Sequence, residues 1–81
     1  MPIYKPRGLK RLAERIKHSR ERLGLTQQEL EQRSGVLRSL IIRVEQCVGD
    51  TSALRLKALA QALGVSADYL LCLTDDPTPR C

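Results

Sequence analysis

Residues 25–45, LTQQELEQRSGVLRSLIIRVE, constrain the fold of this chain more than any other segment. Thr26, followed three residues later by Glu29, is the capping-box pattern of a helix start. Gly35 supplies the positive φ that a sharp turn needs. Beyond it, Ile41 and Val44 lie three residues apart and so share one face of a following helix. The segment therefore predicts two short helices, at about residues 27–34 and 38–46, joined by a glycine turn.

Two short helices around such a glycine form a helix-turn-helix, whose second helix can enter the major groove of DNA. The charge distribution agrees with a nucleic-acid partner. The chain has a net charge of +5, and residues 1–22 carry eight basic and only two acidic side chains. A basic segment of this kind commonly meets nucleic acid or an anionic membrane. Charge alone also fits a solvated helix face.

The remaining sequence follows helical patterns as well. A first helix is expected from Leu9 to the glycine at Gly24, and Ser52 and Ser66 are expected to cap a fourth and a short fifth helix. The apolar positions of the first and fourth helices are Leu9, Leu12, Ala13, Ile16, Leu23, Leu54, Leu56, Leu59, Ala60 and Leu63. No strand pattern occurs, so the sequence predicts an all-α domain of five helices.

The sequence lacks the residues that are characteristic of several classes of function. There is no P-loop or GxGxxG, and the single histidine, His18, has no serine and acidic partners in a catalytic arrangement, so we expect no enzyme. Three widely spaced cysteines indicate neither a disulfide framework nor a zinc site. We expect no metal, cofactor or small-molecule ligand. Without a membrane span or signal-peptide pattern, the expected location is the cytoplasm.

Four segments occur in a family-specific order: RIKHSRERLGLTQQEL, RSGV, IIRVE and LKALAQALGVSADYLL. Over residues 16–73 they resemble the lambdoid phage repressor and Cro-type DNA-binding domains, also called the xenobiotic-response-element family. The resemblance implies a lambda-repressor-like five-helix fold. The residues themselves predict an irregular basic arm at 1–8, which has two prolines and a glycine, the helix-turn-helix domain at 9–74, and a flexible tail at 75–81, which has no apolar pattern. The resemblance also implies binding of double-stranded operator DNA as a homodimer, in repression or autoregulation. The candidate dimer face is Leu70, Leu71 and Leu73.

The resemblance assigns roles to individual positions. Those that match base-reading residues are Arg38, Ser39, Ile42 and Arg43. Those that match phosphate contacts are Gln27, Gln28, Leu37 and Gln46. Those of the arm that would neutralise phosphates or enter the minor groove are Lys5, Arg7, Lys10 and Arg11. Arg20 and Glu45 match a structural ion pair that fixes the second helix of the motif against the first helix of the domain.

The sequence also departs from the family pattern. Leu37 cannot act as an N-cap, Glu31 stands where alanine is usual, and Cys47 stands where a glycine usually ends the helix. Leu37, Leu40 and Ile42 make residues 37–46 unusually apolar for a DNA-reading helix and its start. Three explanations remain open: contacts to thymine methyl groups, a protein-interaction module such as an anti-repressor or antitoxin-like regulator, or a Leu40 that joins the core. The retained arginines and the basic arm favour DNA.

Overall fold

The computed structural model describes residues 7–47 and 51–78 of the chain. The described part is all-helical, as predicted, with five helices and no strand. The helices are α1 (Arg7–Arg22), α2 (Gln27–Ser34), α3 (Arg38–Glu45), α4 (Ala53–Leu63) and α5 (Ala67–Leu70).

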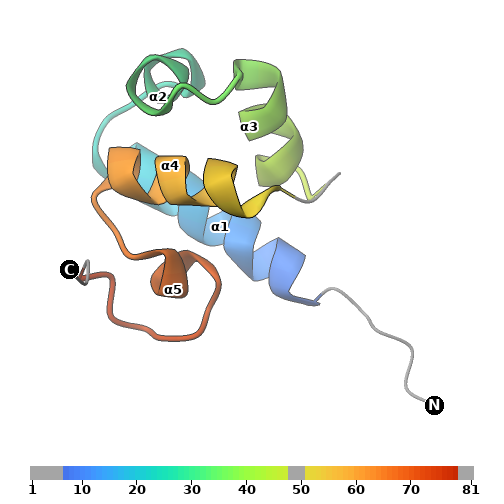
Figure 1. Cartoon of the computed structure of the whole chain (residues 1–81), viewed down its shortest axis with the longest axis vertical. Coiled ribbons are helices and arrows are strands. Elements are labelled where there is room, and N and C mark those ends of the chain that lie inside the picture. The colour runs from blue at the N-terminus through green and yellow to red at the C-terminus, as the bar shows by residue number, and fades with distance from the viewer. Residues whose placement is uncertain (1–6, 48–50, 79–81) are drawn as a thin grey trace.

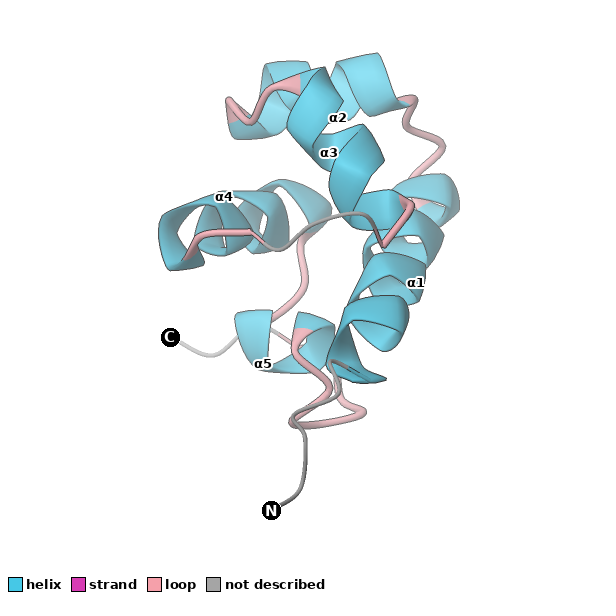
Figure 2. Ribbon diagram, turned by 90° about the vertical axis from the view of Figure 1, so that its right-hand side faces the viewer, coloured by secondary structure: helices cyan, strands magenta, loops and turns pink. Residues whose placement is uncertain are grey.

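Helices α2 and α3 lie together at one end of the molecule, α5 lies at the other, and α1 and α4 lie between them (Figure 1). A quarter turn shows the same order, with α1 and α4 side by side beneath the α2–α3 pair (Figure 2). Helix α3 packs on α1, and α2 packs on α4. The helix-turn-helix is therefore carried on a base formed by two longer helices.

Short-range hydrogen bonds set most helix ends at the expected residues. The hydroxyl of Thr26 accepts from the backbone N–H of Glu29 at 3.1 Å, and the Thr26 N–H donates to the Glu29 carboxylate at 3.0 Å. Gly35 ends α2 with a φ of 76°, a conformation that glycine adopts without strain. Ser52 and Ser66 cap α4 and α5. These caps confirm the bounds that the sequence predicted for α2 and the N-termini of α4 and α5.

Helix α1 begins at Arg7, two residues before the expected start at Leu9 and inside the segment expected to be an irregular arm. Helix α3 ends at Glu45, with Gln46 as its C-cap residue. Both differences lie within the range in which helix ends fray.

The core draws on all five helices. Its largest fully buried side chains are Ile16, Leu30, Ile41, Leu59, Leu63 and Leu70. Leu40 is half-buried and packs against this cluster. Of the explanations for the apolar residues of α3, the structure thus supports the one in which Leu40 joins the core.

Three apolar positions differ from expectation. Leu54 is 80% exposed because it lies two residues before the buried Leu56, which places it on nearly the opposite face of α4. Leu23 is 45% exposed and is the first residue after the end of α1. Leu70 belongs to the core at 0% exposure, so only Leu71 and Leu73 of the expected dimer face are accessible.

Arg15 joins α1 to α5 and to the segment that follows it. Its guanidinium donates to the carbonyl oxygens of Tyr69 and Thr74 at 2.6 and 2.7 Å, and to the Asp75 carboxylate at 2.7 Å. Its Cζ lies 4.3 Å from the centroid of the Tyr69 ring, within cation–π range. The hydrogen bond with Asp75 raises the pKa of Arg15. The Ser66 N–H donates to the carbonyl of Pro77 at 2.9 Å, so this stretch of the expected tail contacts the bundle at two points.

Arg20 and Glu45 form a bidentate ion pair between α1 and α3. The Arg20 Nε and Nη2 atoms donate to the two carboxylate oxygens of Glu45 at 2.9 and 3.1 Å. The side chains are only 11% and 4% exposed, and Nη1 donates to the Leu25 carbonyl at 2.8 Å. The pair therefore fixes the end of α3 against the end of α1 and the turn that follows.

Replacement of Arg20 by alanine is expected to lower the free energy of unfolding by about 3–5 kcal/mol, because it leaves the buried Glu45 carboxylate without its charge partner. Urea denaturation followed by circular dichroism measures the change. The control is Arg22→Ala, since Arg22 is exposed on the same helix and makes none of these bonds. An Arg20→Ala protein with the wild-type unfolding midpoint would refute the structural role of the pair.

Cys47 follows α3 with a φ of 59°, in the left-handed region that favours glycine. Cys47→Gly is expected to raise the free energy of unfolding by roughly 0.5–1 kcal/mol, because the steric cost of the β-carbon is removed and glycine's greater backbone entropy offsets part of the gain. The same urea titration measures it. Cys47→Ala is the matched control, which keeps the β-carbon and should bring no such gain. Equal midpoints for the glycine and alanine variants would contradict the strain argument.

Candidate nucleic-acid interface

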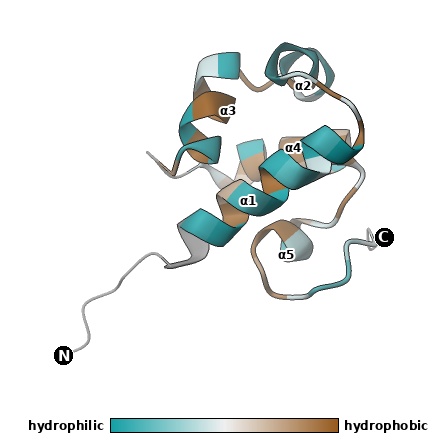
Figure 3. Cartoon of the chain, turned by 180° about the vertical axis from the view of Figure 1, so that it is seen from behind, coloured by the Kyte–Doolittle hydropathy of each residue, from teal (hydrophilic) through white to brown (hydrophobic). Residues whose placement is uncertain are grey.

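The outward face of α3 carries the side chains that the sequence assigned to base reading. Arg38, Ser39 and Arg43 are exposed and Ile42 is half-buried. The opposite face buries Ile41 and Val44 in the core, which fixes the rotation of the helix about its axis. Figure 3 shows the hydrophobic stretch within α3 between hydrophilic ends. The structure therefore keeps the two arginines and Ser39 accessible on a helix anchored from behind.

Gln27, the first residue of α2, is tied to the end of α3. Its side-chain Nε2 donates to Glu45 Oε1 at 3.2 Å, so it shares the carboxylate with Arg20. Gln27 is half-buried and Gln28 beside it is exposed. The first N–H groups of a helix have no partner within it and carry the positive end of the helix dipole. The start of α2 thus offers an anion two backbone donors, at a place fixed relative to α3.

A concavity of about 630 Å³ lies at this helix start. Its lining consists of Lys17, Arg20, Gly24, Leu25, Thr26, Gln27, Gln28 and Arg38. Arg38 therefore lies beside the expected phosphate contacts as well as at the start of α3. Because Glu45 neutralises Arg20, the cations left to attract an anion here are Lys17 and Arg38.

Lys17 is a residue to which the sequence alone assigned no role. It lies three residues before Arg20 on α1 and so shares a helix face with it. That spacing was the available signal. The spacing alone does not predict the role, because it depends on the end of α1 lying beside the start of α2.

The other assigned residues are more dispersed. Leu37 is 60% exposed and makes no side-chain cap, and Gln46 is exposed at the end of α3. Lys10 and Arg11 are exposed on the part of α1 farthest from α2 (Figure 1). Arg7 is the first residue of α1, but its side chain and the whole of Lys5 lie outside the described residues.

The apolar character of α3 is largely internal. Leu40 packs against the core and Ile42 is half-buried, so Leu37 is the one large apolar side chain of residues 37–45 that is exposed. One exposed leucine between arginines is a smaller apolar patch than those that usually mark a protein-binding surface. The geometry therefore favours a polar, positively charged face for a polyanionic partner.

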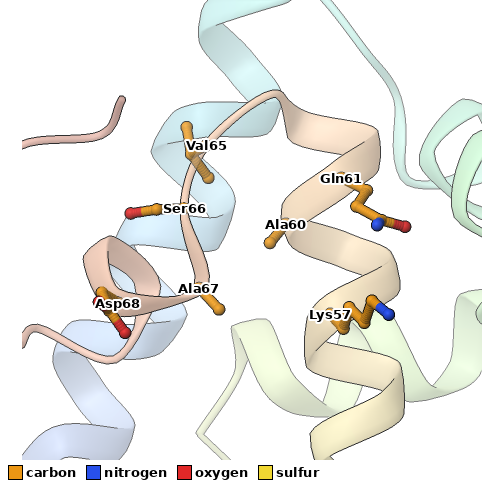
Figure 4. A pocket seen from close by; sticks show the side chains of 7 residues that line it. All are labelled: Lys57, Ala60, Gln61, Val65, Ser66, Ala67 and Asp68. Atoms are coloured by element: carbon orange, nitrogen blue, oxygen red, sulfur yellow. The ribbon is translucent and has the colours of Figure 1, made fainter. Parts of the chain in front are cut away.

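A second concavity, of about 320 Å³, lies between α4 and α5. Figure 4 shows Ala60 and Ala67 pointing into the gap, with Val65 and Ser66 on the connection between the helices. The hydroxyl of Ser66 already accepts from the N–H of Tyr69 at 3.0 Å, as the cap of α5. The polar lining side chains Lys57, Gln61 and Asp68 come from the two helices around it.

Within residues 7–47 and 51–78, no group of three or more histidine, cysteine or acidic side chains is placed to hold a metal ion. In the same part of the chain, no helix has the length and apolar character needed to cross a bilayer.

Comparison with known proteins agrees with this geometry. The helix-turn-helix family model matches residues 16–70. The restriction-modification controller protein C.AhdI from Aeromonas hydrophila has a similar structure, with a TM-score of 0.73 and 31% identity, over 76% of this chain and 94% of that one. The hypothetical transcription factor NHTF from Neisseria has a TM-score of 0.74 and 28% identity, over 88% of this chain and 85% of that one.

The family match and both solved structures confirm the resemblance and the fold that the sequence indicated. The matched residues span the two helices of the motif, the buried face of α3 and the α4–α5 region that completes the core. This family consists of DNA-binding regulators rather than enzymes. The chain accordingly belongs to the helix-turn-helix family and is a DNA-binding transcriptional regulator.

Proposed function

We propose that this protein is a repressor or autoregulator that binds operator DNA with α3 in the major groove. The observation that carries the proposal is the arrangement of α3: a core-anchored helix whose outward side chains, Arg38, Ser39 and Arg43, lie beside the electropositive start of α2. A helix held in this way presents its N-terminal half to base edges. We also propose a cytoplasmic location, which the match to a family of DNA-binding regulators supports.

Each outward residue of α3 is suited to a particular contact. An arginine at 38 or 43 can donate two hydrogen bonds to O6 and N7 of a guanine, a contact worth about 1–3 kcal/mol of discrimination. Ser39 can bond to a base or a phosphate. Ile42 is half-buried, and its accessible part suits the methyl group of a thymine. Because Arg38 also lines the concavity, a phosphate contact is its alternative role.

The concavity at the start of α2 suits a backbone phosphate. The N–H groups of Gln27 and Gln28 would donate to it, and Lys17 and Arg38 would balance its charge. At the start of α3, Leu37 has only its backbone to offer, whereas the exposed amide of Gln46 can reach a phosphate beyond the far end of the helix. Lys5, Arg7, Lys10 and Arg11 would follow the neighbouring backbone or minor groove.

A two-fold dimer fits this function, because two recognition helices about 34 Å apart would match half-sites one turn apart. Leu71 and Leu73 are 45% and 73% exposed just after α5, and they are the candidate contact between copies. C.AhdI is a controller protein of a restriction-modification system, which supports a regulatory role for a chain of this fold.

Selection of duplexes from a random pool tests direct reading. The wild type is expected to enrich a palindromic motif, and Arg43→Ala to lose the preference at one base pair of each half-site, by roughly 5- to 150-fold in affinity. Lys17→Ala should instead weaken all sequences alike and reduce the salt dependence by about one phosphate contact. Arg38→Ala shows which of the two patterns applies to Arg38.

The control is Arg55→Ala, which removes the same charge from the exposed surface of α4 and should keep the motif. A wild type that enriches no motif at low salt, but captures a protein partner through Leu37, would replace this proposal with the protein-interaction module.

The dimer proposal is tested by sedimentation velocity with Leu73→Asp. A charge at this position in both copies should raise the dimer dissociation constant by a factor on the order of 100, since each buried leucine contributes about 1.5–3 kcal/mol. Leu54→Asp is the matched control, because Leu54 is at least as exposed but lies on α4. A wild type that stays monomeric with and without its duplex, or a Leu54→Asp that dissociates as readily, would reject this interface.

A further inference from the structure

Helix α3 begins without an N-cap of its own. Leu37 stands at the cap position and makes no side-chain hydrogen bond, although its carbonyl accepts the first helical bonds, from Leu40 and Ile41. The first N–H groups of a helix need partners outside its own ladder, and the side chain of a serine, threonine or aspartate at the cap usually provides one. The helix proposed to read bases therefore lacks the usual stabilisation of its first turn.

A carboxylate from α2 takes over this role. Glu31 is half-buried, and its Oε2 accepts from the backbone N–H of Arg38 at 2.9 Å. A charged acceptor at a helix N-terminus is favoured both by the hydrogen bond and by the helix dipole. The bond spans seven residues, so it joins two helices rather than closing a local turn.

The connection between the helices is fixed by side chains as well. The Ser34 hydroxyl donates to the carbonyl of Leu30 at 2.7 Å and accepts from the N–H of Val36 at 3.1 Å. Val36 is buried in the core. The bonds of Ser34 and the burial of Val36 thus hold the first part of the connection. The hydrogen bond from Glu31 holds its exposed second part, at Leu37 and Arg38, where α3 begins.

We propose that Glu31 is a positioning residue of the DNA-binding surface: its carboxylate replaces the cap missing at Leu37 and holds the first turn of α3, with Arg38 and Ser39, in register with α2. Two departures from the family pattern, the acid in α2 and the leucine at the cap, compensate for each other. The inference rests on the proposed reading of DNA by α3, but the capping itself does not require DNA. Glu31 acts through the backbone of α3 rather than through contact with bases.

Non-additivity is the signature of this role. Glu31→Ala removes the outside partner of the Arg38 N–H and frees the first turn. Leu37→Ser provides a local cap, so it should stabilise the first turn more when Glu31 is absent than when Glu31 is present. Glu31→Gln removes the charge but keeps an oxygen acceptor, and should lie between the wild type and Glu31→Ala. Gln32→Ala is the control on α2, because Gln32 is exposed and makes none of these bonds.

The first measurement is hydrogen exchange of backbone amides by NMR on the full chain without DNA. Glu31→Ala is expected to speed exchange of the Arg38 amide about fivefold, the factor that corresponds to a cap worth about 1 kcal/mol. Leu37→Ser, whose hydroxyl would accept from the N–H of Ser39 or Leu40, should slow exchange of those two amides and steady the first turn without providing a partner for Arg38. Amides at the centre of α1 should be unaffected. Wild-type exchange at Arg38 in Glu31→Ala would overturn the capping role.

The second measurement is affinity for two probes, the duplex recovered by the selection and a random-sequence duplex of equal length. Glu31→Ala should bind the selected duplex about fivefold more weakly relative to the random one, and Leu37→Ser should restore that ratio. An unchanged ratio, or a loss that Leu37→Ser fails to rescue, would overturn positioning. If the wild type binds neither duplex, the proposed function fails and positioning with it, whereas the exchange data still decide the capping.

Discussion

The buried carboxylate of Glu45 is the point on which the arrangement of the helix-turn-helix depends. It accepts two hydrogen bonds from Arg20 on α1 and one from the side chain of Gln27 on α2. Burial of an ion pair costs desolvation free energy, which only good geometry and further hydrogen bonds offset. Here the bidentate fork and the bond from Arg20 to the Leu25 carbonyl provide both. What the pair chiefly secures is geometry, since one carboxylate links the end of α1, the start of α2 and the end of α3.

Helix α3 is consequently held at three places. Glu45 anchors its last turn, Ile41 and Val44 bury its inner face, and the bond from Glu31 meets its first residue. Eight residues are too few to form a stable helix alone in water, so these outside contacts maintain it. A surface that is already ordered loses less conformational entropy when a partner binds, which suits the reading of a rigid duplex.

The same contacts determine which charges remain for DNA. Glu45 neutralises Arg20 in an ion pair. Near α5, Arg15 forms an ion pair with Asp75 and hydrogen bonds to two carbonyl groups. Lys17, Arg38 and Arg43 are exposed and form no ion pair among the described residues, and the first two lie where α2 opens its free N–H groups. The tertiary structure thus separates the basic residues into two groups: those that hold the bundle together through ion pairs and those that face outward.

The helices could be predicted from the sequence alone, because their signals are local. The Thr26–Glu29 capping box, the Gly35 turn and the serines before α4 and α5 act within three or four residues, so the bounds of α2 could be predicted closely. Ordered motifs along the chain also indicated the family and the Arg20–Glu45 pair. Periodicity was less informative about burial: it finds an apolar face but not the side on which neighbours pack. For that reason Leu54 was expected in the core and is exposed, whereas Leu40 turned inward.

The contacts between distant residues, in contrast, arise from the packing of the helices. Arg15 meets Asp75 across 60 positions, Lys17 joins the concavity at α2, and Glu31 completes the start of α3. No local rule places these groups together, because their distances depend on how the helices cross. The sequence could show that α3 lacked a cap and that α2 carried an unusual acid. That the second compensates for the first follows from the angle between the two helices, which the shared core imposes.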